Sequence, residues 1–369
     1  MKAVSKVLLI LSAASAMWAC DRYVGPSRQT VPYVESVLAG SDQHTLGLLA
    51  ASRAPLPSGS IVFIGSSADC NAFAEGFAAC DERDNVDARP FPDGLADFAG
   101  ETLVCISDDY TVDFADTAAC RAFRERTVRK VVAALDTLAH VSPFDLEGLI
   151  RKPAAKLVIL GDMDMCEYGG FDVDTLLRST SCDIPVVHPV DHMFGTLFDS
   201  GRGRAMNIGV IADVDGVADS LRYVSAFMRH AARRGLSEDS RCFVFPSAAE
   251  GDSLLHRLVL SYARENRRPL DAVVVDDYGL DVDSLKSELA DMISVMNESS
   301  MTYGRFLARD FVLMDVFGEV CSACHSILRE RNLFTHDISQ VQTVSYTPVD
   351  LPDSDDGSIL LIPVSYVQN

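Results

Sequence analysis

Aspartates stand just after five of the apolar runs in this sequence, and their type and spacing make them the residues most able to do chemistry. If those runs are strands of a parallel sheet, their carboxyl ends meet at one edge, where open α/β sheets bind ligands. Carboxylates gathered at such an edge repel one another unless a cation, a ligand amine or sugar hydroxyls satisfy them. The five segments are Ser66-Ser67-Ala68-Asp69, Ser107-Asp108-Asp109-Tyr110, Asp162-Met163-Asp164, Asp213-Val214-Asp215 and Asp276-Asp277-Tyr278.

These segments also permit a plainer interpretation, because aspartate after a strand often only caps the next helix. Their recurrence favours a shared binding site instead. Tyr110 and Tyr278 add flat faces beside carboxylates, a combination suited to polar or cationic small molecules. No cofactor is predicted, and the pattern leaves open whether a metal binds. The residues predicted to line the site are Ser66, Asp69, Asp109, Asp162, Asp213 and Asp277.

Short apolar runs alternate with stretches of helical period through the middle of the chain. Apolar strands separated by such helices predict an α/β protein with a mostly parallel sheet covered on both faces. Helical stripes are expected over 118–138, 217–231, 254–259 and 285–296. The strands are expected at Ile61–Ile64, Leu103–Ile106, Leu157–Leu160, Pro185–Val187, Ile208–Ile211, Phe243–Phe245 and Ala272–Val275.

The length of 369 residues suits two lobes, and Gly201-Arg202-Gly203-Arg204 interrupts the alternation where one lobe would end. A long helix is expected from about Tyr303 to Arg331, before a final strand at Ile359–Val364. The predicted order is a signal peptide (1–19), a lipid-anchored tether (20–58), an N-terminal α/β lobe (59–203), a C-terminal α/β lobe (204–302) and a crossover helix with the closing strand (303–369).

This order of elements resembles the type I periplasmic solute-binding fold over roughly residues 58 to 369. The resemblance implies two doubly wound, Rossmann-like lobes with a ligand in the cleft between them. It also implies that lipid-anchored forms exist in bacteria, which agrees with the N-terminus.

The N-terminus indicates export. Two lysines within Met1–Lys6 precede an apolar stretch that ends at Cys20 and is too short to span a membrane. The ending Met17-Trp18-Ala19-Cys20 resembles the bacterial lipobox, which implies acylation of Cys20 and attachment to a bacterial membrane in the cell envelope, on its periplasmic or surface face. A plain secretory signal with an incidental cysteine is the alternative. The lipid is expected to be the sole membrane attachment, because no later apolar run approaches spanning length.

Acidic side chains outnumber basic ones, 53 to 32, which gives a formal net charge of −21. Such a surface repels nucleic acids and anionic lipid headgroups. A small polar solute is therefore the expected partner, nucleic acid is not, and an envelope protein is the other partner considered.

A second interpretation is enzymatic. The segment 211–220 places Asp213 and Asp215 after a strand and resembles the first motif of haloacid dehalogenase-like phosphohydrolases. That resemblance makes Asp213 the nucleophile, Asp215 the general acid–base and Mg²⁺ the cofactor. Ser247 would match the hydroxyl motif and Asp276-Asp277 the late acidic pair, while no lysine lies between Ser247 and Asp276.

The order of strand, Asp183-Ile184-Pro185-Val186, helix and Gly-Arg turn is also similar to aspartate/glutamate racemases. That family places a thiolate after one strand in each lobe. Here the matching places hold Gly161-Asp162 and Asp276-Asp277, so proton abstraction by a cysteine pair is not predicted.

Nine cysteines remain after Cys20, an odd number in a compartment that permits disulfides. Cys321-Ser322-Ala323-Cys324-His325 matches the string that attaches c-type haem. Both of its cysteines fall on the apolar stripe of the expected long helix, which favours a buried dithiol or a disulfide over haem. Local pairs considered are Cys70 with Cys80, Cys105 with Cys120 and Cys166 with Cys182, with ordinary buried thiols as the alternative.

The sequence thus favours an envelope lipoprotein that binds a small polar ligand in an interlobe cleft lined by Asp and Ser residues, and it does not favour an enzyme. The Mg-dependent phosphohydrolase is one alternative. A non-catalytic envelope scaffold is the other, and it would retain a protein partner rather than a solute.

Overall fold

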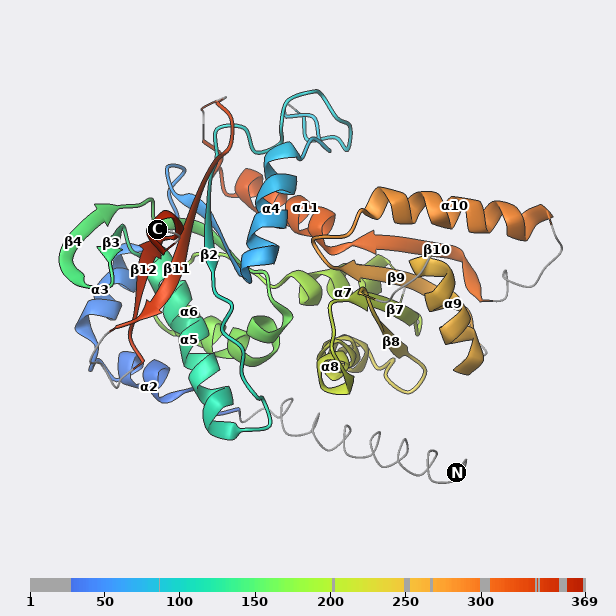
Figure 1. Ribbon diagram of the computed structural model, residues 1–369, viewed down its shortest axis with the longest axis horizontal. Coiled ribbons are helices and arrows are strands. Elements are labelled where there is room, and N and C mark those ends of the chain that lie inside the picture. Colours follow the sequence, from blue (N-terminus) through green and yellow to red (C-terminus); the bar gives the residue numbers. More distant parts are fainter. Residues whose placement is uncertain are drawn as a thin grey trace. The chain divides into compact units, whose positions relative to one another are not determined.

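The computed structural model divides into two compact units, whose elements are labelled in Figure 1. It describes residues 28–85, 87–200, 203–248, 253–265, 268–298, 306–335, 337, 339–351 and 357–367. The six-stranded unit comprises Val31–Met193, Asp276–Asp281 and Asp315–Asn369, and the four-stranded unit comprises Phe194–Val275 and Val282–Met314. The signal peptide, Cys20, Gly201, Arg202 and Tyr303 lie outside the described residues, so what the sequence predicts for them stays a prediction.

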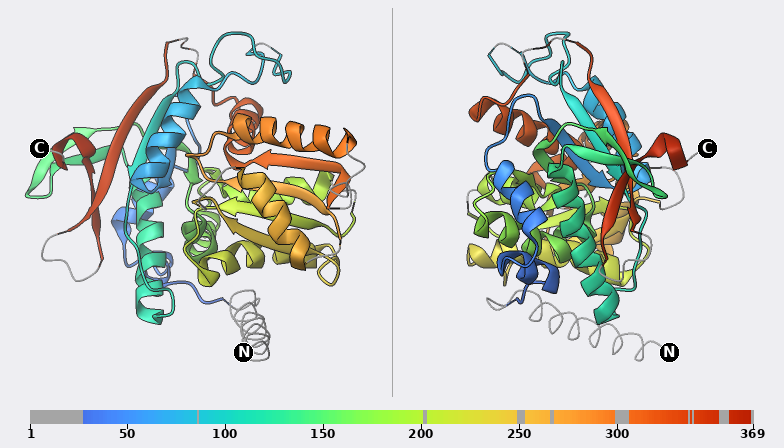
Figure 2. Two further views of the ribbon diagram at one scale, coloured as in Figure 1. Left: turned by 45° about the vertical axis from the view of Figure 1, so that its right-hand side comes forward. Right: turned by 90° about the vertical axis from the view of Figure 1, so that its left-hand side faces the viewer.

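The six-stranded unit is built on one sheet with the strand order β12-β11-β2-β1-β5-β6. All neighbouring strands are parallel except β11 and β12, and Figure 2 shows β11 running along β2. The prediction of an α/β protein with a mostly parallel sheet is confirmed. The strands are β1 (Ser60–Gly65), β2 (Thr102–Ser107), β5 (Ala155–Leu160), β6 (Val186–Val187), β11 (Gln342–Asp350) and β12 (Ile359–Pro363).

Helices cover both faces of this sheet because side chains alternate along each strand and both sets are apolar. Val62 and Ile64 of β1 belong to the core that also holds the apolar sides of α2, α3, α5 and α6. Phe63 points to the opposite face and stacks on Phe73 of α4, with ring centroids 4.2 Å apart. The helices are α2 (Pro32–Leu38), α3 (Gln43–Ala51), α4 (Ser67–Ala79), α5 (Thr117–Leu135), α6 (Gly170–Ser179), α11 (Val316–Glu330) and α12 (Val364–Val367), with a π-helix η1 (Met165–Gly169) ahead of α6.

Residues 31–58 form part of the six-stranded unit, although the sequence assigns them to a tether. Val34, Val37 and Leu49 are fully buried in its core. The backbone amide of Val31 donates to the buried carboxylate of Asp172 at 3.0 Å. Pro32 starts α2 at a position that needs no amide donor, so the prolines that mark this stretch as a linker are compatible with helix.

The stripe expected over 118–138 ends earlier, at Leu135, the last residue of α5. Asp136 is extended (φ −68°, ψ 151°) and its carboxylate accepts the amide of Leu138, which stops the helix. Leu138 instead begins a hairpin of β3 (Leu138–Ser142) and β4 (Asp145–Arg151), paired antiparallel. This hairpin is too polar and irregular to stand out as apolar runs.

The four-stranded unit carries a sheet with the order β10-β9-β7-β8, in which β7 and β8 are parallel. Leu258 of α9 packs against Gly209 of β7, so the strand passes close beneath that helix. The three central apolar runs predicted here all form strands. The elements are α7 (Pro189–Ser200), β7 (Asn207–Ala212), α8 (Val217–Arg233), β8 (Arg241–Pro246), α9 (Leu254–Glu265), β9 (Leu270–Asp276), α10 (Val282–Glu298) and β10 (Leu307–Asp315).

The long helix expected from Tyr303 to Arg331 is wrong in its first half, where β10 lies. Leu307 and Phe311 are four residues apart, a spacing that also puts them on one face of a strand, and Asp310 on the opposite face is exposed. The helix starts only at Val316, because the carboxylate of Asp315 accepts the amides of Phe317 and Gly318 and caps α11.

The chain passes from the six-stranded to the four-stranded unit between Met193 and Phe194, within α7, whereas the sequence places the boundary after Gly203. The reason is packing, since Phe194 and Phe198 contact the ring of Phe227 in α8 at 5.6 and 5.1 Å. Within the described residues, no helix has the length and apolar character needed to cross a bilayer.

Candidate ligand site at the acidic edge of the six-stranded sheet

Strands β1, β2 and β5 end side by side at one edge of the six-stranded sheet. The amide of Asp108 donates to the Gly65 carbonyl at 2.9 Å, and the amide of Gly161 donates to the Ile64 carbonyl at 2.8 Å. Gly161 permits this close ending, because a Cβ there would lie 2.1 Å from the Phe63 ring. The acidic segments that follow these strands therefore leave the sheet at neighbouring positions, as the sequence predicts for parallel strands.

Ser66 and Asp69 form the first wall of the site, at the start of α4. Ser66 caps the helix by accepting the amide of Asp69 at 3.1 Å. Its hydroxyl in turn donates to Asp69 Oδ2 at 2.7 Å, which fixes the carboxylate over the end of β1. Both side chains are half-buried rather than sealed in the core.

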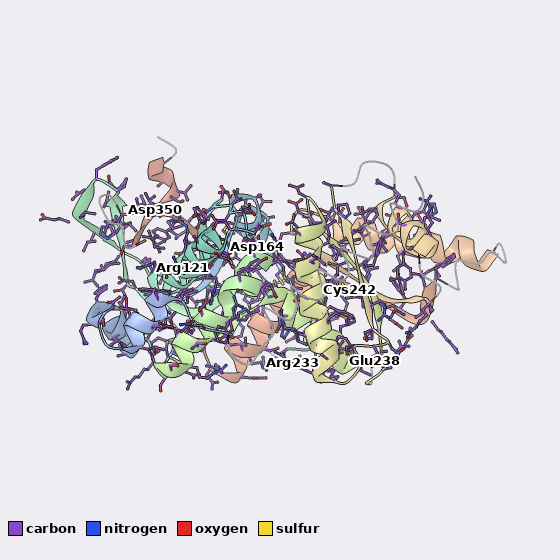
Figure 3. All side chains as sticks on the ribbon, turned by 90° about the horizontal axis from the view of Figure 1, so that it is seen from below. Arg121, Asp164, Arg233, Glu238, Cys242 and Asp350 are labelled. Carbon is purple, nitrogen blue, oxygen red and sulfur yellow. The ribbon has the colours of Figure 1, made fainter. Side chains whose placement is uncertain are left out.

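Asp162 and Asp164 supply the second wall, after β5. Asp162 Oδ1 accepts the amide of Asp164 at 2.7 Å, and Asp164, labelled in Figure 3, leads directly into η1. A π-helix is rare and is often found at functional sites, because its extra residue reorients the turn that carries it. The sequence pattern offers no signal for it.

The third wall is the segment Asp276–Asp281, which follows β9 but belongs to the six-stranded unit. Tyr278 packs edge-on against Phe63 and Phe73, with ring centroids at 5.5 and 5.8 Å. Its hydroxyl is buried and has no hydrogen-bond partner within the described part of the chain. Asp277 Oδ1 accepts the amide of Gly279 at 2.9 Å, so it also shapes its own turn.

Three of the predicted carboxylates interact electrostatically. Burial raises the pKa of Asp69, and repulsion by Asp162 and Asp277 raises it further against the opposing hydrogen bonds from Ser66. The pKa of Tyr278 lies well above its ordinary value because of burial and the nearby Asp276 and Asp69. The site therefore disfavours further negative charge and gains from a cation or a hydrogen-bond donor.

Lys130 of α5 lies behind the site, and its side chain is only 3 % exposed. Its Nζ is 3.1 Å from Asp108 Oδ2 and 3.2 Å from Met165 Sδ of η1. Burial lowers the pKa of Lys130, while Asp108 and also Asp162 act in the opposite direction. Although sequence reasoning missed Lys130, a lysine between Val128 and Val131 on the apolar stripe is a signal that could have marked it.

Asp108 is held by cations and acts as a structural group. Burial alone would raise its pKa, yet Arg126 and Lys130 outweigh that effect and lower it. Arg126 Nε lies 2.8 Å from Asp108 Oδ2, and the same guanidinium pairs with Asp350 at the end of β11 (labelled in Figure 3). The ion pairs of Asp108 with Arg126 and with Lys130 thus hold α5 against the end of β2.

Asp109 fits the capping interpretation. Its two carboxylate oxygens accept the amide and the hydroxyl of Ser67, each at 2.7 Å, at the exposed start of α4. It stands at the same sheet edge as Ser66. Its hydrogen bonds instead join the end of β2 to the start of α4, and Asp109 is not one of the three interacting carboxylates.

Asp213 belongs to the four-stranded unit, where it follows β7 and is exposed. Ser247 follows the parallel neighbour β8, and its amide donates to the Ala212 carbonyl at 2.8 Å. Asp213 and Ser247 therefore share one sheet edge. The prediction that Asp213 joins the other carboxylates in one interlobe cleft stays a prediction.

The haem-like string lies within α11. Cys321, Cys324 and His325 are all buried there, and the His325 ring packs near Phe98 and Phe334. The expectation that the two cysteines belong to an apolar helix face is confirmed. Among the described residues, no group of three or more His, Cys, Asp or Glu side chains is arranged to hold a metal ion.

No protein-family model and no curated protein sequence matches the chain. Similar solved structures include the glutamate racemase from Francisella tularensis subsp. tularensis SCHU S4 in complex with D-glutamate. The match has 11 % sequence identity and a TM-score of 0.47, and it covers 85 % of this chain and 95 % of the racemase chain. Glutamate racemase isoform RacE1 from Bacillus anthracis is similar at 11 % identity and a TM-score of 0.44, covering 78 % and 88 %. A LacI transcriptional regulator from a Rhodococcus species is similar at 12 % identity and a TM-score of 0.25, covering 82 % and 96 %.

Proposed function

We propose that the chain is a lipid-anchored protein of the bacterial cell envelope that binds a small polar solute through a cationic group, such as an amine, at the acidic edge of the six-stranded sheet. The observation that carries the binding proposal is the convergence of half-buried carboxylates, since burial raises the pKa of Asp69 and repulsion by Asp162 and Asp277 adds to that effect. Convergent like charges in a half-buried place are costly unless a ligand offsets them.

The charges of the site favour a cation over an anion. The two cations beside the site, Lys130 and Arg126, are both engaged by Asp108, so they do not neutralise Asp69, Asp162 and Asp277. An ammonium group placed among the remaining three would gain charge-assisted hydrogen bonds, each about twice as strong as a neutral one. The buried hydroxyl of Tyr278 is a further polar group that a solute or its water can satisfy.

A thermal-shift screen tests this proposal. The panel contains aliphatic amines and amino acids as cations, with sugars, nucleosides and divalent ions for comparison. Cationic solutes are expected to stabilise the protein, and the shift is expected to vanish in Asp69→Asn and Asp162→Asn. The matched control is Asp113→Asn, an exposed aspartate of the same unit that makes the same change of charge.

Silence across the panel would count against solute binding and favour the envelope scaffold, which predicts retention of a protein partner instead. Stabilisation that persists in Asp69→Asn and Asp162→Asn would place the ligand elsewhere.

The anchor is tested independently of the ligand. Metabolic labelling with palmitate in a bacterial host is expected to mark the wild-type chain and to leave Cys20→Ser unlabelled. Equal labelling of both, or of neither, would contradict acylation at Cys20.

A second candidate function is the phosphohydrolase at Asp213. The placement of Asp213 and Ser247 at one edge of the β7–β8 pair supports it. It predicts Mg²⁺-dependent hydrolysis of an aryl phosphate that disappears in Asp213→Asn. Lack of hydrolysis with Mg²⁺ present would remove this candidate and leave the solute-binding proposal untouched.

A further inference from the structure

Four cysteines form two close pairs around α4, the helix that carries Asp69. All nine cysteines of the described residues are free thiols in the structure. The two pairs do not match the local pairs considered from the sequence. Cys70 and Cys80 stand near opposite ends of α4, about 15 Å apart at 1.5 Å per residue, beyond the 7 Å that a disulfide can span between Cα atoms.

The first pair joins α4 to the sheet. Cys70 lies in the first turns of α4 and Cys105 lies on β2 directly beneath it. Cys105 Sγ is 3.7 Å from the Cys70 carbonyl oxygen, and the two thiols are hydrogen-bond neighbours. Both are almost fully buried, with 3 % and 1 % of their surfaces exposed.

The second pair joins the other end of α4 to α11. Cys80 is the C-cap residue of α4, and its buried thiol donates to Asp97 Oδ2 at 3.4 Å. The same thiol lies beside that of Cys321 in α11, close enough to help raise the Cys321 pKa. The helices are in direct contact here, since a Cβ on Gly76 would lie 2.7 Å from the Phe317 ring. Cys324, one helical turn beyond Cys321, is also buried near Cys80.

We propose that in an oxidising compartment α4 is fixed at both ends by disulfides, Cys70–Cys105 and Cys80–Cys321. The oxidant is a disulfide compound, such as oxidised glutathione or a dithiol–disulfide exchange protein. One thiolate of the chain attacks a sulfur of the donor, which forms a mixed disulfide and releases the first donor thiol. The second thiolate of the chain then attacks the chain sulfur of that mixed disulfide and releases the second donor thiol. Each bond thus removes two protons and two electrons from the chain and reduces one donor disulfide to two thiols.

The bonds form during folding rather than afterwards. The hydrogen bond to Cys105, together with burial, raises the pKa of Cys70, and burial with the neighbouring Cys80 raises the pKa of Cys321 well above its ordinary range. Thiolates are therefore scarce in the folded chain, and exchange is slow once the core has closed. The functional consequence is a rigid α4, which keeps Ser66 and Asp69 in place at the site.

Peptide mapping tests the proposal. The mature chain is refolded in a mixture of reduced and oxidised glutathione, its remaining thiols are alkylated under denaturing conditions, and it is digested without reduction. Trypsin leaves Cys70 and Cys80 together on residues 54–83, so cleavage after Glu75 is added to separate them, and cleavage before Asp108 separates Cys105 from Cys120. Cys324→Ser distinguishes pairing at Cys321 from pairing at Cys324.

The expected result is two linked peptides, Cys70 with Cys105 and Cys80 with Cys321, together with a fall in Tm on the order of 10 °C when the oxidised protein is reduced. The double variant Cys105→Ser/Cys321→Ser is expected to lose this sensitivity to reductant, whereas Cys242→Ser in the four-stranded unit is expected to keep it. Complete alkylation of the nine thiols without prior reduction, or links between any other cysteines, would overturn the proposal. The wild-type map decides even if the double variant does not fold.

Discussion

A buried ion pair at the amino edge of the six-stranded sheet allows a quantitative prediction. Lys156 Nζ lies 2.5 Å from Glu101 Oε2, and both side chains are 0 % exposed. Nζ also donates to the carbonyls of Pro57 and Leu333 at 2.9 and 2.7 Å, while Glu101 Oε1 accepts the amide of Thr335 at 2.8 Å. The pair therefore joins two strands to the segments before β1 and after α11.

Removing one partner leaves an uncompensated charge in the dry interior. Lys156→Met is expected to lower the free energy of unfolding by about 3–5 kcal/mol, and Glu101→Met by a similar amount. The double variant Lys156→Met/Glu101→Met is expected to recover most of this loss, because two apolar side chains of similar volume need no partner. In Tm, each single variant should fall by roughly 10 °C.

Urea unfolding followed by circular dichroism measures these changes. The control is Lys286→Met, because Lys286 and Asp283 form an exposed pair 3.0 Å apart, whose loss should cost less than about 1 kcal/mol. A loss below about 1 kcal/mol in Lys156→Met would refute the reasoning. Simple additivity in the double variant would refute it as well.

Three further predictions concern single side chains. Burial lowers the pKa of Lys152 to about 8 against an ordinary 10.5, so between these pH values the unfolded chain holds a proton that the folded chain has lost. The free energy of unfolding, relative to that of Lys152→Met, should therefore rise with pH across this window by on the order of 3 kcal/mol. A difference between the two proteins that stays constant with pH in urea unfolding would contradict this. Because burial and like charge raise the pKa of Asp69, its contribution to stability is present below its pKa in the unfolded chain and is lost as the pH rises through its pKa in the folded chain. Asp69→Asn should therefore raise Tm at pH 7 and abolish the increase in Tm caused by amines. A lower Tm in this variant would argue against repulsion at the site. The carboxylate of Asp172 is fully buried between Arg124 and the Val31 amide. Asp172→Asn should therefore lower the free energy of unfolding by about 3 kcal/mol and expose residues 31–51 to limited proteolysis. Cleavage of the variant at the wild-type rate would show that Asp172 does not hold that segment.

The central strands could be predicted from the sequence because a strand that is buried on both faces consists of a continuous apolar run. β1, β2, β5, β7, β8 and β9 each lie where an apolar run predicts them. Their parallel pairing follows from the helices between them. The sheet edge that carries Ser66, Asp69 and Asp162 could therefore be predicted as well.

Elements with weaker local signals could not be predicted. The spacing of Leu307, Phe311 and Met314 predicts a helix where β10 lies, and only the cap at Asp315 separates β10 from α11. The strand β11 begins with three exposed residues, alternates between half-buried and buried residues only from Ser345 to Val349, and has no apolar run. Its position beside β2 depends on tertiary pairing rather than on local pattern.

Which residues belong to the site depends on contacts between segments that are distant in the sequence, and the spacing of residues does not predict these contacts. Asp108 and Asp109 are adjacent in the sequence, yet one is neutralised by Arg126 and Lys130 while the other caps α4. The return of Asp277 to the six-stranded unit after β9 likewise has no local sequence signal. Such roles follow from charges that are distant in sequence.

The most direct test of the central claim is a titration of the Asp69 side-chain carboxyl by carbon-13 NMR, assigned by comparison with Asp69→Asn. Burial, together with repulsion by Asp162 and Asp277, predicts a pKa above the ordinary aspartate value in the free protein. Saturation with an amine that stabilises the protein should then lower that pKa, because a cation favours the ionised form. An ordinary pKa that does not respond to any cationic solute would contradict the account.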